Sequence, residues 1–480
     1  MAEAPDIILI TSDQQRGDCL GIEGHPALQT PNLDHLGASG TRFRRAYAES
    51  PSCIPARRSL MTGTAPAAHG MVGFRDGVAW NPAHTLAGTL ARAGYETVMI
   101  GKLHLWPRRR PFGFERMLLA DWTGDDGHND YVRWLRREHG VIGVDPAMAH
   151  GVSPNSWVSR PHHLPETQMH TFWCIEEAMR FLQQREGRRP LFLNISFIDP
   201  HPPLTPPAFY YDRYINRELP SPVIGDWAPR FDGPRKGLNP EAFEISLDHH
   251  DMRCARAGYY GMINFIDDQV GRLVRFARRQ LTEAFMVYTS DHGEMLGDHN
   301  LFRKGYAYEA SARVPMLMRA PIGWGLAPRV IDDQPVGLQD VMPTLLDAAG
   351  VDVPDTCTGR SLLPIMRGGS ERVRPVLHGE HAGARSNAGS VQFITDGRHK
   401  YIWFAQDGRE QLFDLEKDPD EQRDLAPSTD ASQLEPWRRQ LATVLRGRPE
   451  GFTDGDRLVA GRTVDALVPG YDPDRMFAFS

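Results

Sequence analysis

Short apolar runs alternate with longer segments of helical periodicity along most of the chain. The apolar runs cover residues 6–11, 95–100, 190–197, 284–290 and 314–318. Their continuity is typical of strands that are buried on both faces of a sheet. Apolar positions at helical spacing mark the segments 31–38, 85–93, 252–280 and 340–349. This alternation predicts an α/β fold in which helices cover a mostly parallel sheet.

The pattern changes after about residue 365. The segments 391–395, 399–404 and 411–415 are short and rich in aromatic residues, and Asp-Gly turns at 396–397 and 407–408 separate them. Such a pattern predicts an antiparallel meander. We therefore divide the chain into a catalytic α/β domain, residues 1–365, and a smaller α+β subdomain, residues 366–480. The polar tail from residue 426 is either an arm that packs on a neighbouring subunit, which would favour a homo-oligomer, or irregular structure.

Two segments, 105–165 and 202–245, are too long to be plain connections and are rich in Pro, His, Trp and Arg. Loops of this size are usually functional or act as lids. Their tryptophans, Trp106, Trp122, Trp157 and Trp227, allow an aromatic pocket without requiring one. We expect substrate specificity to come from these segments.

Polar side chains gather directly after four of the predicted strands. They are Asp13 and Gln14, Lys102 and His104, Asp199 and His201, and Asp291 and His292. Each residue alone has an ordinary explanation, such as a turn former or a packed histidine. Ligands of open α/β sheets bind at the carboxyl ends of the strands, so the coincidence over four strands predicts one shared site.

Asp13, Gln14, Asp291 and His292 form a candidate site for a divalent metal. Carboxylate and amide oxygens suit hard cations such as Ca²⁺ and Mg²⁺. The imidazole favours Mn²⁺ or another first-row ion, so Mn²⁺ and Ca²⁺ are the leading candidates. The alternative is a purely structural polar cluster.

The segment 50–63, SPSCIPARRSLMTG, carries the sharpest pattern. Cys53 begins a C-x-P-x-R motif that includes Arg57 and is followed by Leu-x-Thr-Gly. The ordinary interpretation is a cysteine in a loop before a short helix. The functional one is a nucleophilic thiol whose pKa is lowered by the helix N-terminus and Arg57.

This segment resembles the maturation signature of the sulfatase family, in which the cysteine is oxidised to formylglycine. Four further motifs resemble that family in the same order: 10–14 (ITSDQ), 101–104 (GKLH), 199–202 (DPHP), and 290–298 (SDHGEMLGD) together with Lys304 and Glu309. The stretch 411–425 is similar to its C-terminal strand and turn. The resemblance implies the three-layer fold of alkaline phosphatase and the sulfatases, and a sulfuric ester hydrolase of aryl or small alkyl sulfates.

The resemblance also implies a nucleophile. A formylglycine-generating enzyme would oxidise Cys53, and the aldehyde would hydrate. One hydroxyl of the hydrate would attack sulfur, and the other would later expel sulfate and regenerate the aldehyde, so that covalent catalysis divides one difficult step into two. The bound metal would lower the pKa of the attacking hydroxyl.

The remaining roles implied by the resemblance fall on five residues. Arg57 would orient the hydrate and the metal-binding carboxylates. Lys102 and Lys304 would neutralise charge on the transferring group. His201, with Lys304, would protonate the leaving oxygen, and His104 would take the proton from the hydrate during ester breakdown.

Two features favour different substrates. Many arylsulfatases have Asp and Asn where this chain has Gln14 and His292, whose pattern is closer to choline sulfatases and phosphonate monoester hydrolases. The phosphonate hydrolases, however, lack the Lys-x-His pair that this chain keeps at Lys102 and His104. Because that pair would contact the transferring group, we favour sulfate monoesters over phosphonate monoesters or phosphate diesters. A protein that fails to mature and only captures sulfated ligands is a more remote alternative.

Composition excludes several classes of protein but does not indicate which reaction the chain catalyses. The 480 residues carry a formal net charge of −7, which argues against a nucleic-acid binder. The sequence contains no apolar run long enough to predict a membrane span, and the first apolar run indicates a strand rather than a signal peptide. The five cysteines lack a C-x-x-C pair, so we expect a cytoplasmic enzyme without a disulfide framework. Asp267 and Asp268 are expected on a solvated helix face.

Overall fold

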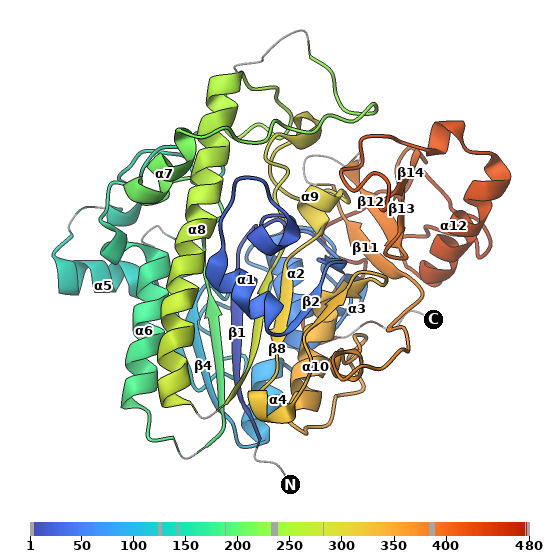
Figure 1. The fold of residues 1–480 in the computed structure, drawn as a ribbon. Helices are drawn as coiled ribbons and strands as arrows, with labels where there is room; N and C mark the ends of the chain where they lie inside the picture. The colour runs from blue at the N-terminus through green and yellow to red at the C-terminus, as the bar shows by residue number, and fades with distance from the viewer. Residues whose placement is uncertain are drawn as a thin grey trace.

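The computed structural model describes residues 4–122, 127–141, 143, 145–187, 189–231, 239–281, 283–383, 389–475 and 477. A large sheet lies between two layers of helices, and a smaller sheet lies beside it with the last helix on its outer side (Figure 1). The architecture is therefore the predicted α/β fold with a separate antiparallel sheet near the C-terminus.

The large sheet has eight strands in the order β5-β4-β6-β1-β7-β8-β2-β9. Their bounds are β1 Asp6–Ser12, β2 Thr41–Phe43, β4 Glu96–Gly101, β5 Arg116–Leu119, β6 Leu191–Ser196, β7 Ala284–Ser290, β8 Met316–Arg319 and β9 Arg329–Ile331. The strands from β5 to β7 in this order are parallel, whereas β8 runs antiparallel to both of its neighbours. The predicted run 314–318 thus corresponds to an antiparallel strand, and the sheet is mixed. A separate two-stranded pair consists of β3 Ala46–Tyr47 and β10 Val336–Gly337.

The helices cover both faces of this sheet. Their bounds are α1 Pro31–Ala38, α2 Cys53–Thr62, α3 Pro66–His69, α4 Leu86–Arg92, α5 Asp130–His139, α6 His170–Gln184, α7 Ala208–Ile215, α8 His249–Gln280, α9 Glu309–Ala312, α10 Val341–Ala348, α11 Leu363–Met366 and α12 Ala431–Val444. The segments predicted as helices, 31–38, 85–93, 252–280 and 340–349, match α1, α4, α8 and α10. The two long segments contain α5 and α7, which the pattern did not predict.

The central strand β1 shows why the core has two halves. Successive side chains of a strand point to opposite faces. Ile7 and Leu9 accordingly pack in the cluster that contains residues of α4 and α10. Ile8 and Ile10 pack in the cluster that contains residues of α6 and α8. All four are fully buried, as the unbroken apolar run predicts.

The prediction of a solvated face at Asp267 is wrong. Its side chain is fully buried on α8 and accepts hydrogen bonds from the backbone amides of Leu33, at 2.7 Å, and Asn32, at 3.2 Å. These amides belong to the first turn of α1, where backbone N–H groups have no partner within the helix. Asp268 accepts a hydrogen bond from the Tyr210 hydroxyl at 2.8 Å. Asp267 therefore binds the start of α1 rather than water, and the half-buried Asp268 contacts α7.

The small sheet is the predicted meander with one additional strand. Its antiparallel order is β11 Leu377–His381, β12 Val391–Thr395, β13 His399–Phe404 and β14 Glu410–Asp414. One face packs against residues of the large domain that include Tyr47 and Tyr308. The opposite face packs against Leu434 and Leu441 of α12. The start of the polar tail is therefore a helix.

Beyond α12 the tail lies against its own chain. The amides of Val72 and Asn81 donate hydrogen bonds of 2.8 Å to the carbonyls of Ala466 and Pro473. The amide of Val468 donates to the carbonyl of Gly70 at 3.0 Å. This path does not support an arm that reaches a neighbouring subunit, and the homo-oligomer remains a prediction.

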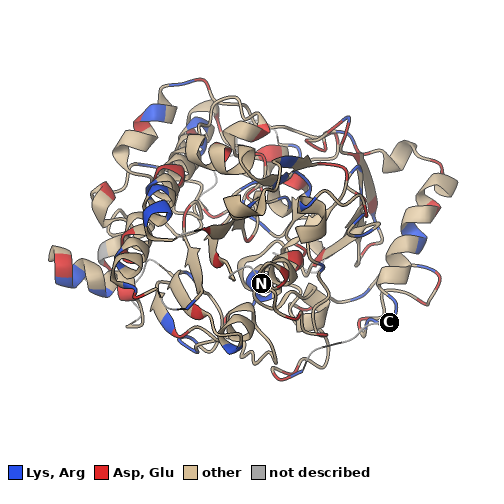
Figure 2. Cartoon of the chain, turned by 60° about the horizontal axis from the view of Figure 1, so that its bottom comes forward, with Lys and Arg blue, Asp and Glu red and all other residues tan. Residues whose placement is uncertain are grey.

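Charged residues of both signs are interspersed over most elements (Figure 2), in keeping with the mild net charge. None of the helices that the structure describes combines the length and apolar character needed to cross a membrane.

A buried ion-pair network joins the small sheet to the large domain. Lys400 of β13 is completely buried, and its Nζ lies 2.7 Å from the carboxylate of Glu309 and 2.9 Å from that of Glu421. Glu309 begins α9, in the segment that follows Lys304. The position of the small sheet is thus tied electrostatically to a segment that also reaches the polar edge of the large sheet.

We expect Lys400→Met to destabilise the protein by about 3–5 kcal/mol, because it leaves two buried carboxylates without their shared cation. Urea denaturation followed by circular dichroism measures this change. Lys417→Met is the matched control, since Lys417 is 79% exposed in its pair with Asp414 and such a pair contributes about 0–1 kcal/mol. Equal effects of the two substitutions would contradict the role of Lys400.

Candidate active site

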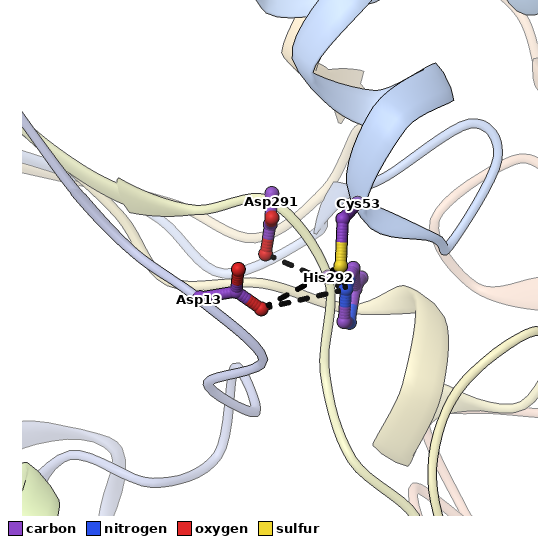
Figure 3. Close-up of side chains that lie close together, drawn as sticks. All are labelled: Asp13, Cys53, Asp291 and His292. Carbon is purple, nitrogen blue, oxygen red and sulfur yellow. Dashed lines mark hydrogen bonds and ion pairs between the residues drawn. The ribbon is translucent and has the colours of Figure 1, made fainter. Parts of the chain in front are cut away.

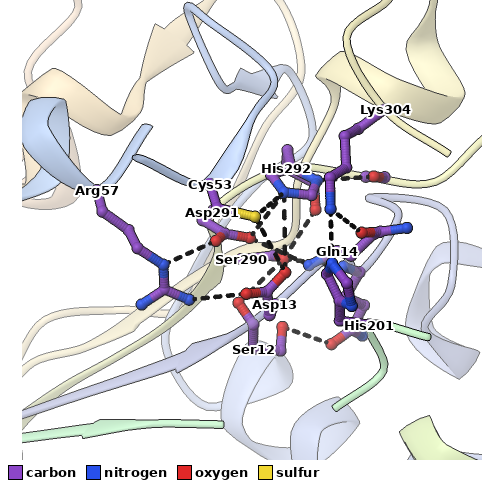
Figure 4. A network of polar contacts seen from close by, with 12 residues as sticks. Ser12, Asp13, Gln14, Cys53, Arg57, His201, Ser290, Asp291, His292 and Lys304 are labelled. Atoms are coloured by element: carbon purple, nitrogen blue, oxygen red, sulfur yellow. Dashed lines mark hydrogen bonds and ion pairs between the residues drawn. The ribbon is translucent and has the colours of Figure 1, made fainter. Parts of the chain in front are cut away.

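Each of the four predicted strand ends contributes a polar side chain to one network, whereas the carboxylate of Asp199 accepts a hydrogen bond from the Thr171 hydroxyl of α6. Strands β4, β6, β1 and β7 are adjacent and parallel, so their carboxyl ends share one edge of the sheet. His201, Asp13 and Asp291 follow three of these strands and lie in one network (Figure 4). Lys102 follows the fourth strand, β4, and its Nζ contacts the carboxylate of Asp13. The expected juxtaposition is therefore present in the structure.

Four donor groups converge at the centre of this network. Ligand atoms of Asp13, Cys53, Asp291 and His292 all lie within 4.8 Å of one another (Figure 3), and each residue is at most 2% exposed. Buried carboxylates gathered this closely require a cation, and the donors suit a divalent ion.

The orientation of His292 also fits a metal ligand. Its Nδ1 lies 2.9 Å from the carbonyl oxygen of Gly293, which can only accept a hydrogen bond, so Nδ1 carries the proton. Nε2 therefore faces the other donor groups, 3.2 Å from Cys53 Sγ and 3.6 and 3.7 Å from the carboxylates of Asp291 and Asp13. A ligating histidine is typically fixed in this way by a hydrogen bond from its other ring nitrogen.

Arg57 lies between the two carboxylates. Its guanidinium donates to Asp291 at 2.9 Å and to Asp13 at 3.2 Å. It also donates to the Lys102 carbonyl at 2.8 Å. Cys53 and Arg57 are four residues apart on α2, so they share one helix face. The C-x-P-x-R spacing thus delivers a thiol and a guanidinium to the same pair of carboxylates.

Positive charge dominates the electrostatics of Asp13. Lys102 Nζ lies 2.5 Å from its carboxylate. Burial alone would raise the pKa of Asp13, but Lys102, His201 and Arg57 together hold that pKa well below its usual value. Burial likewise opposes ionisation of Cys53, yet Lys304 and Lys102 lower the pKa of its thiol.

Gln14, His201 and Lys304 form the second part of the network. Lys304 Nζ lies 2.6 Å from the amide oxygen of Gln14 and 2.7 Å from His201 Nε2. His201 Nδ1 lies 2.7 Å from the carbonyl oxygen of Pro202, which fixes the proton on Nδ1 and leaves Nε2 to accept from Lys304. Gln14 has a backbone φ of 69°, a left-handed conformation that is uncommon for a residue with a side chain.

His104 is held by a residue that sequence analysis missed. The carboxylate of Asp121 accepts hydrogen bonds from the backbone amides of Leu103, at 2.7 Å, and His104, at 2.8 Å. Asp121 follows β5, so the signal that identified the other strand ends was present, but β5 itself was not predicted. Burial and the charges of Lys102 and Arg57 hold the pKa of His104 well below its usual value.

A cavity of about 610 Å³ opens onto this network. The predicted residues Cys53, Lys102, His104, His201 and Lys304 line it. Trp106 and Trp122 line it as well, whereas Trp157 and Trp227 are not part of its wall. The long segment 105–165 therefore contributes to the wall of the cavity, and its role in substrate specificity stays a prediction.

Distant segments complete the wall of the cavity. Phe74, Phe243, Arg303, His381 and residues 464–466 of the tail all line it. Both ring nitrogens of His381 are buried without a hydrogen-bond partner among the residues that the structure describes. Phe243 belongs to the second long segment, 202–245, whereas the other residues stand in no recognisable motif, so the sequence alone offered no signal for them.

Comparison with known proteins identifies the family. A family model described as sulfatase matches residues 5–351 of the chain. This chain belongs to the sulfatase family. It is therefore an enzyme, a sulfuric ester hydrolase, as the motifs predicted. A second model, described as the C-terminal part of N-sulphoglucosamine sulphohydrolase, matches residues 297–446, which include the small antiparallel sheet.

Relatives within and around the sulfatase family align over nearly the whole chain. An arylsulfatase of Clostridium perfringens is 40% identical over 96% of this chain and 99% of its own length. A choline-sulfatase of Rhizobium meliloti is 32% identical over 88% of this chain and 82% of its own. Among solved structures, a phosphonate monoester hydrolase of Agrobacterium radiobacter matches with a TM-score of 0.77 and 26% identity, over 92% of this chain and 95% of that chain.

We expect Arg57→Gln to destabilise the metal-free protein by about 3–5 kcal/mol, because two buried carboxylates lose the cation between them. Thermal and urea unfolding in the presence of EDTA measure this change. Arg75→Gln removes a guanidinium from an ion pair with Asp465 in which both side chains are about half exposed, and it should cost less than about 1 kcal/mol. If the Arg57 variant is as stable as this control, the two carboxylates do not depend on Arg57.

Proposed function

We propose that the enzyme hydrolyses sulfate monoesters with aryl or small alkyl leaving groups, and that its nucleophile is a formylglycine hydrate made from Cys53 by a formylglycine-generating enzyme. The observation that carries this proposal is the place of Cys53. It begins α2, lines the catalytic cavity, and lies among Asp13, Asp291 and His292. The family and the arylsulfatase relative support the same substrate class.

An aldehyde hydrate suits this chemistry because it supplies two hydroxyls on one carbon. One forms the covalent ester with the transferring group, and the other allows the ester to break by carbon–oxygen cleavage. A serine ester would instead need water to attack a poor sulfur electrophile. The position of Cys53 at the start of a helix, facing Lys304 and Lys102, favours negative charge on the oxygen that attacks.

Asp13, Gln14, Asp291 and His292 would hold the divalent metal, with Mn²⁺ and Ca²⁺ favoured. The convergence of Asp13, Asp291 and His292 and the fixed ring of His292 support this assignment. Gln14 directs its amide oxygen toward Lys304 in the same network. When bound, the metal lowers the pKa of a coordinated hydroxyl and polarises the ester.

Lys102 and Lys304 would bind the charged oxygens of the sulfate group. Both ammonium groups line the cavity next to Cys53, and fixed cations in a site that excludes water stabilise the charge of a transition state strongly. His104 would accept a proton during ester breakdown. Its depressed pKa keeps the ring neutral at pH 7, and its Nδ1 is buried without a partner among the described residues.

Protonation of the leaving group would involve Lys304 and His201 as a pair. Burial and the charge of Lys304 hold the pKa of His201 well below its usual value, so the imidazole is neutral. Its Nε2 accepts from the Lys304 ammonium. The available proton of this pair therefore lies on Lys304, and His201 orients it.

Phosphonate monoester or phosphate diester hydrolysis is the second candidate. Gln14 and His292 favour it, and the phosphonate monoester hydrolase structure supports it. Lys102 and His104, which line the cavity beside Cys53, favour sulfate.

Side-by-side kcat/KM values on an aryl sulfate and an aryl phosphonate monoester test this choice. The enzyme should be co-expressed with a formylglycine-generating enzyme, and the oxidation state of Cys53 should be measured by mass analysis of its peptide. We expect a sulfate-to-phosphonate ratio well above one, and activity that rises with the fraction of formylglycine. A ratio well below one in fully matured enzyme would favour the second candidate.

The role of Lys304 as proton donor can be tested with two substrates whose leaving groups differ in their need for a proton. Lys304→Met should lower kcat/KM on an alkyl sulfate by a factor of about 10²–10⁴ more than on 4-nitrophenyl sulfate, because nitrophenolate departs without a proton. Steady-state kinetics on both esters measure the difference. An equal loss on the two esters would leave Lys304 as a charge-neutralising group alone.

A further inference from the structure

Glu294 is a buried carboxylate that none of the roles above uses. It lies two residues after His292 and is 2% exposed. One of its oxygens accepts hydrogen bonds from the backbone amides of Leu296, at 2.9 Å, and Arg303, at 2.5 Å. The other oxygen accepts a hydrogen bond from the side-chain amide nitrogen of Gln14. The two backbone N–H groups can only donate, so the oxygen that faces them acts as an acceptor.

The amide of Gln14 is thereby held in one orientation. A glutamine amide has a donating end and an accepting end, and its neighbours decide which way it faces. Glu294 can only accept and therefore requires the nitrogen, whereas the Lys304 ammonium can only donate and therefore requires the oxygen. Both neighbours select the same orientation.

The backbone of Gln14 is fixed as well, so a change at this residue means rotation of its side-chain amide. Its N–H donates to the carboxylate of Asp291 at 3.1 Å, and its carbonyl accepts from the Tyr259 hydroxyl at 2.6 Å. Rotation of the terminal amide by a half turn would replace the oxygen at the catalytic edge with an NH₂ group. That group cannot ligate a cation and would face the Lys304 ammonium.

Glu294 also fixes the loop that carries Lys304. The residue before Lys304, Arg303, has a left-handed φ of 70°. Its amide donates to Glu294 and its carbonyl accepts from the Met295 amide at 2.9 Å. A single carboxylate therefore links the end of β1, which carries Gln14, to the loop that presents Lys304.

We propose that Glu294 is a positioning residue that sets the orientation of the Gln14 amide, so that its oxygen faces the metal position and Lys304. The part that concerns the metal rests on the proposed function. The orientation itself rests only on the contacts of Gln14, Glu294 and Lys304.

A cycle of the variants Glu294→Gln, Gln14→Glu and their combination tests the proposal. Glu294→Gln removes the acceptor that the Gln14 nitrogen needs, and Gln14→Glu places two carboxylates against each other. The double variant restores one donor facing one acceptor, with the two functional groups exchanged. We expect Gln14→Glu to be more favourable, for both ion affinity and Tm, in the Glu294→Gln background than in the wild type.

The first readout is calorimetric titration of the EDTA-treated full chain with Ca²⁺ and, separately, Mn²⁺. Glu294→Gln should weaken binding by about 10–100-fold, as is typical when a residue that orients a metal ligand is lost. Gln14→Glu adds a charged oxygen, which changes ion affinity by itself. The change in affinity that it causes is therefore measured in the wild type and in Glu294→Gln, and we expect the two changes to differ at least tenfold. Equal effects, or unchanged affinity in Glu294→Gln, would overturn the proposal.

The second readout is the Tm of the metal-free protein. Gln14→Glu should lower the Tm in the wild-type background and raise it in the Glu294→Gln background. A lowering in both backgrounds would overturn the assigned orientation. Failure of wild type to bind either ion would overturn the part that concerns the metal, while the Tm cycle still decides the orientation.

Asp267→Asn is the matched control. It makes the same chemical change at a buried carboxylate that also accepts two backbone amides, but on α8 under α1. It should change Tm without changing ion affinity. Neither readout uses a sulfate ester or formylglycine, so failure of the proposed substrate and failure of this inference give different results.

Discussion

Charge balance around Asp13 and Asp291 is the constraint on which the rest of the structure depends. Two carboxylates without solvent exposure cannot remain ionised side by side unless cations surround them. Arg57 contacts both of them, and Lys102 contacts Asp13. These cations come from α2 and from the loop after β4, so burial of the two carboxylates depends on the sheet edge, the helix and the loop together.

This constraint explains how fold and chemistry are coupled. Parallel strands place their carboxyl ends at one edge, and each strand end contributes one part of the network. Because the strands are apolar runs buried on both faces, helices on either side hold the sheet where the polar groups begin. The polar edge of the sheet is accordingly set by backbone geometry, whereas the cavity above it is assembled from segments that come from distant parts of the chain.

The sequence predicted those site residues whose position follows from their near neighbours in the chain. Asp13, Lys102 and Asp291 directly follow apolar runs, so a strand and its polar end could be recognised together. Cys53 and Arg57 share one helix face through their spacing. The same reasoning failed at Asp267. The pattern of α8 predicts a helix, but it does not reveal that the start of α1 packs against the face that carries this carboxylate.

Other features depend on contacts that no local pattern carries. The helices α5 and α7 lie within segments interrupted by Pro and aromatic residues, and α12 within a polar tail. Arg303 and His381 reach the cavity through a tight loop and through the edge strand of the small sheet. Their importance follows only from where the chain brings them, which a single sequence does not express.

The C-terminal tail runs back along the chain and becomes part of the cavity wall. Residues 464–466 form part of the cavity wall, and the hydrogen bonds at Val72 and Asn81 attach this stretch beside the segment that follows α3. Deleting the tail, or displacing it with a bulky fusion partner, would therefore reshape this cavity directly. An expression strategy for this enzyme should accordingly place affinity tags at the other end of the chain.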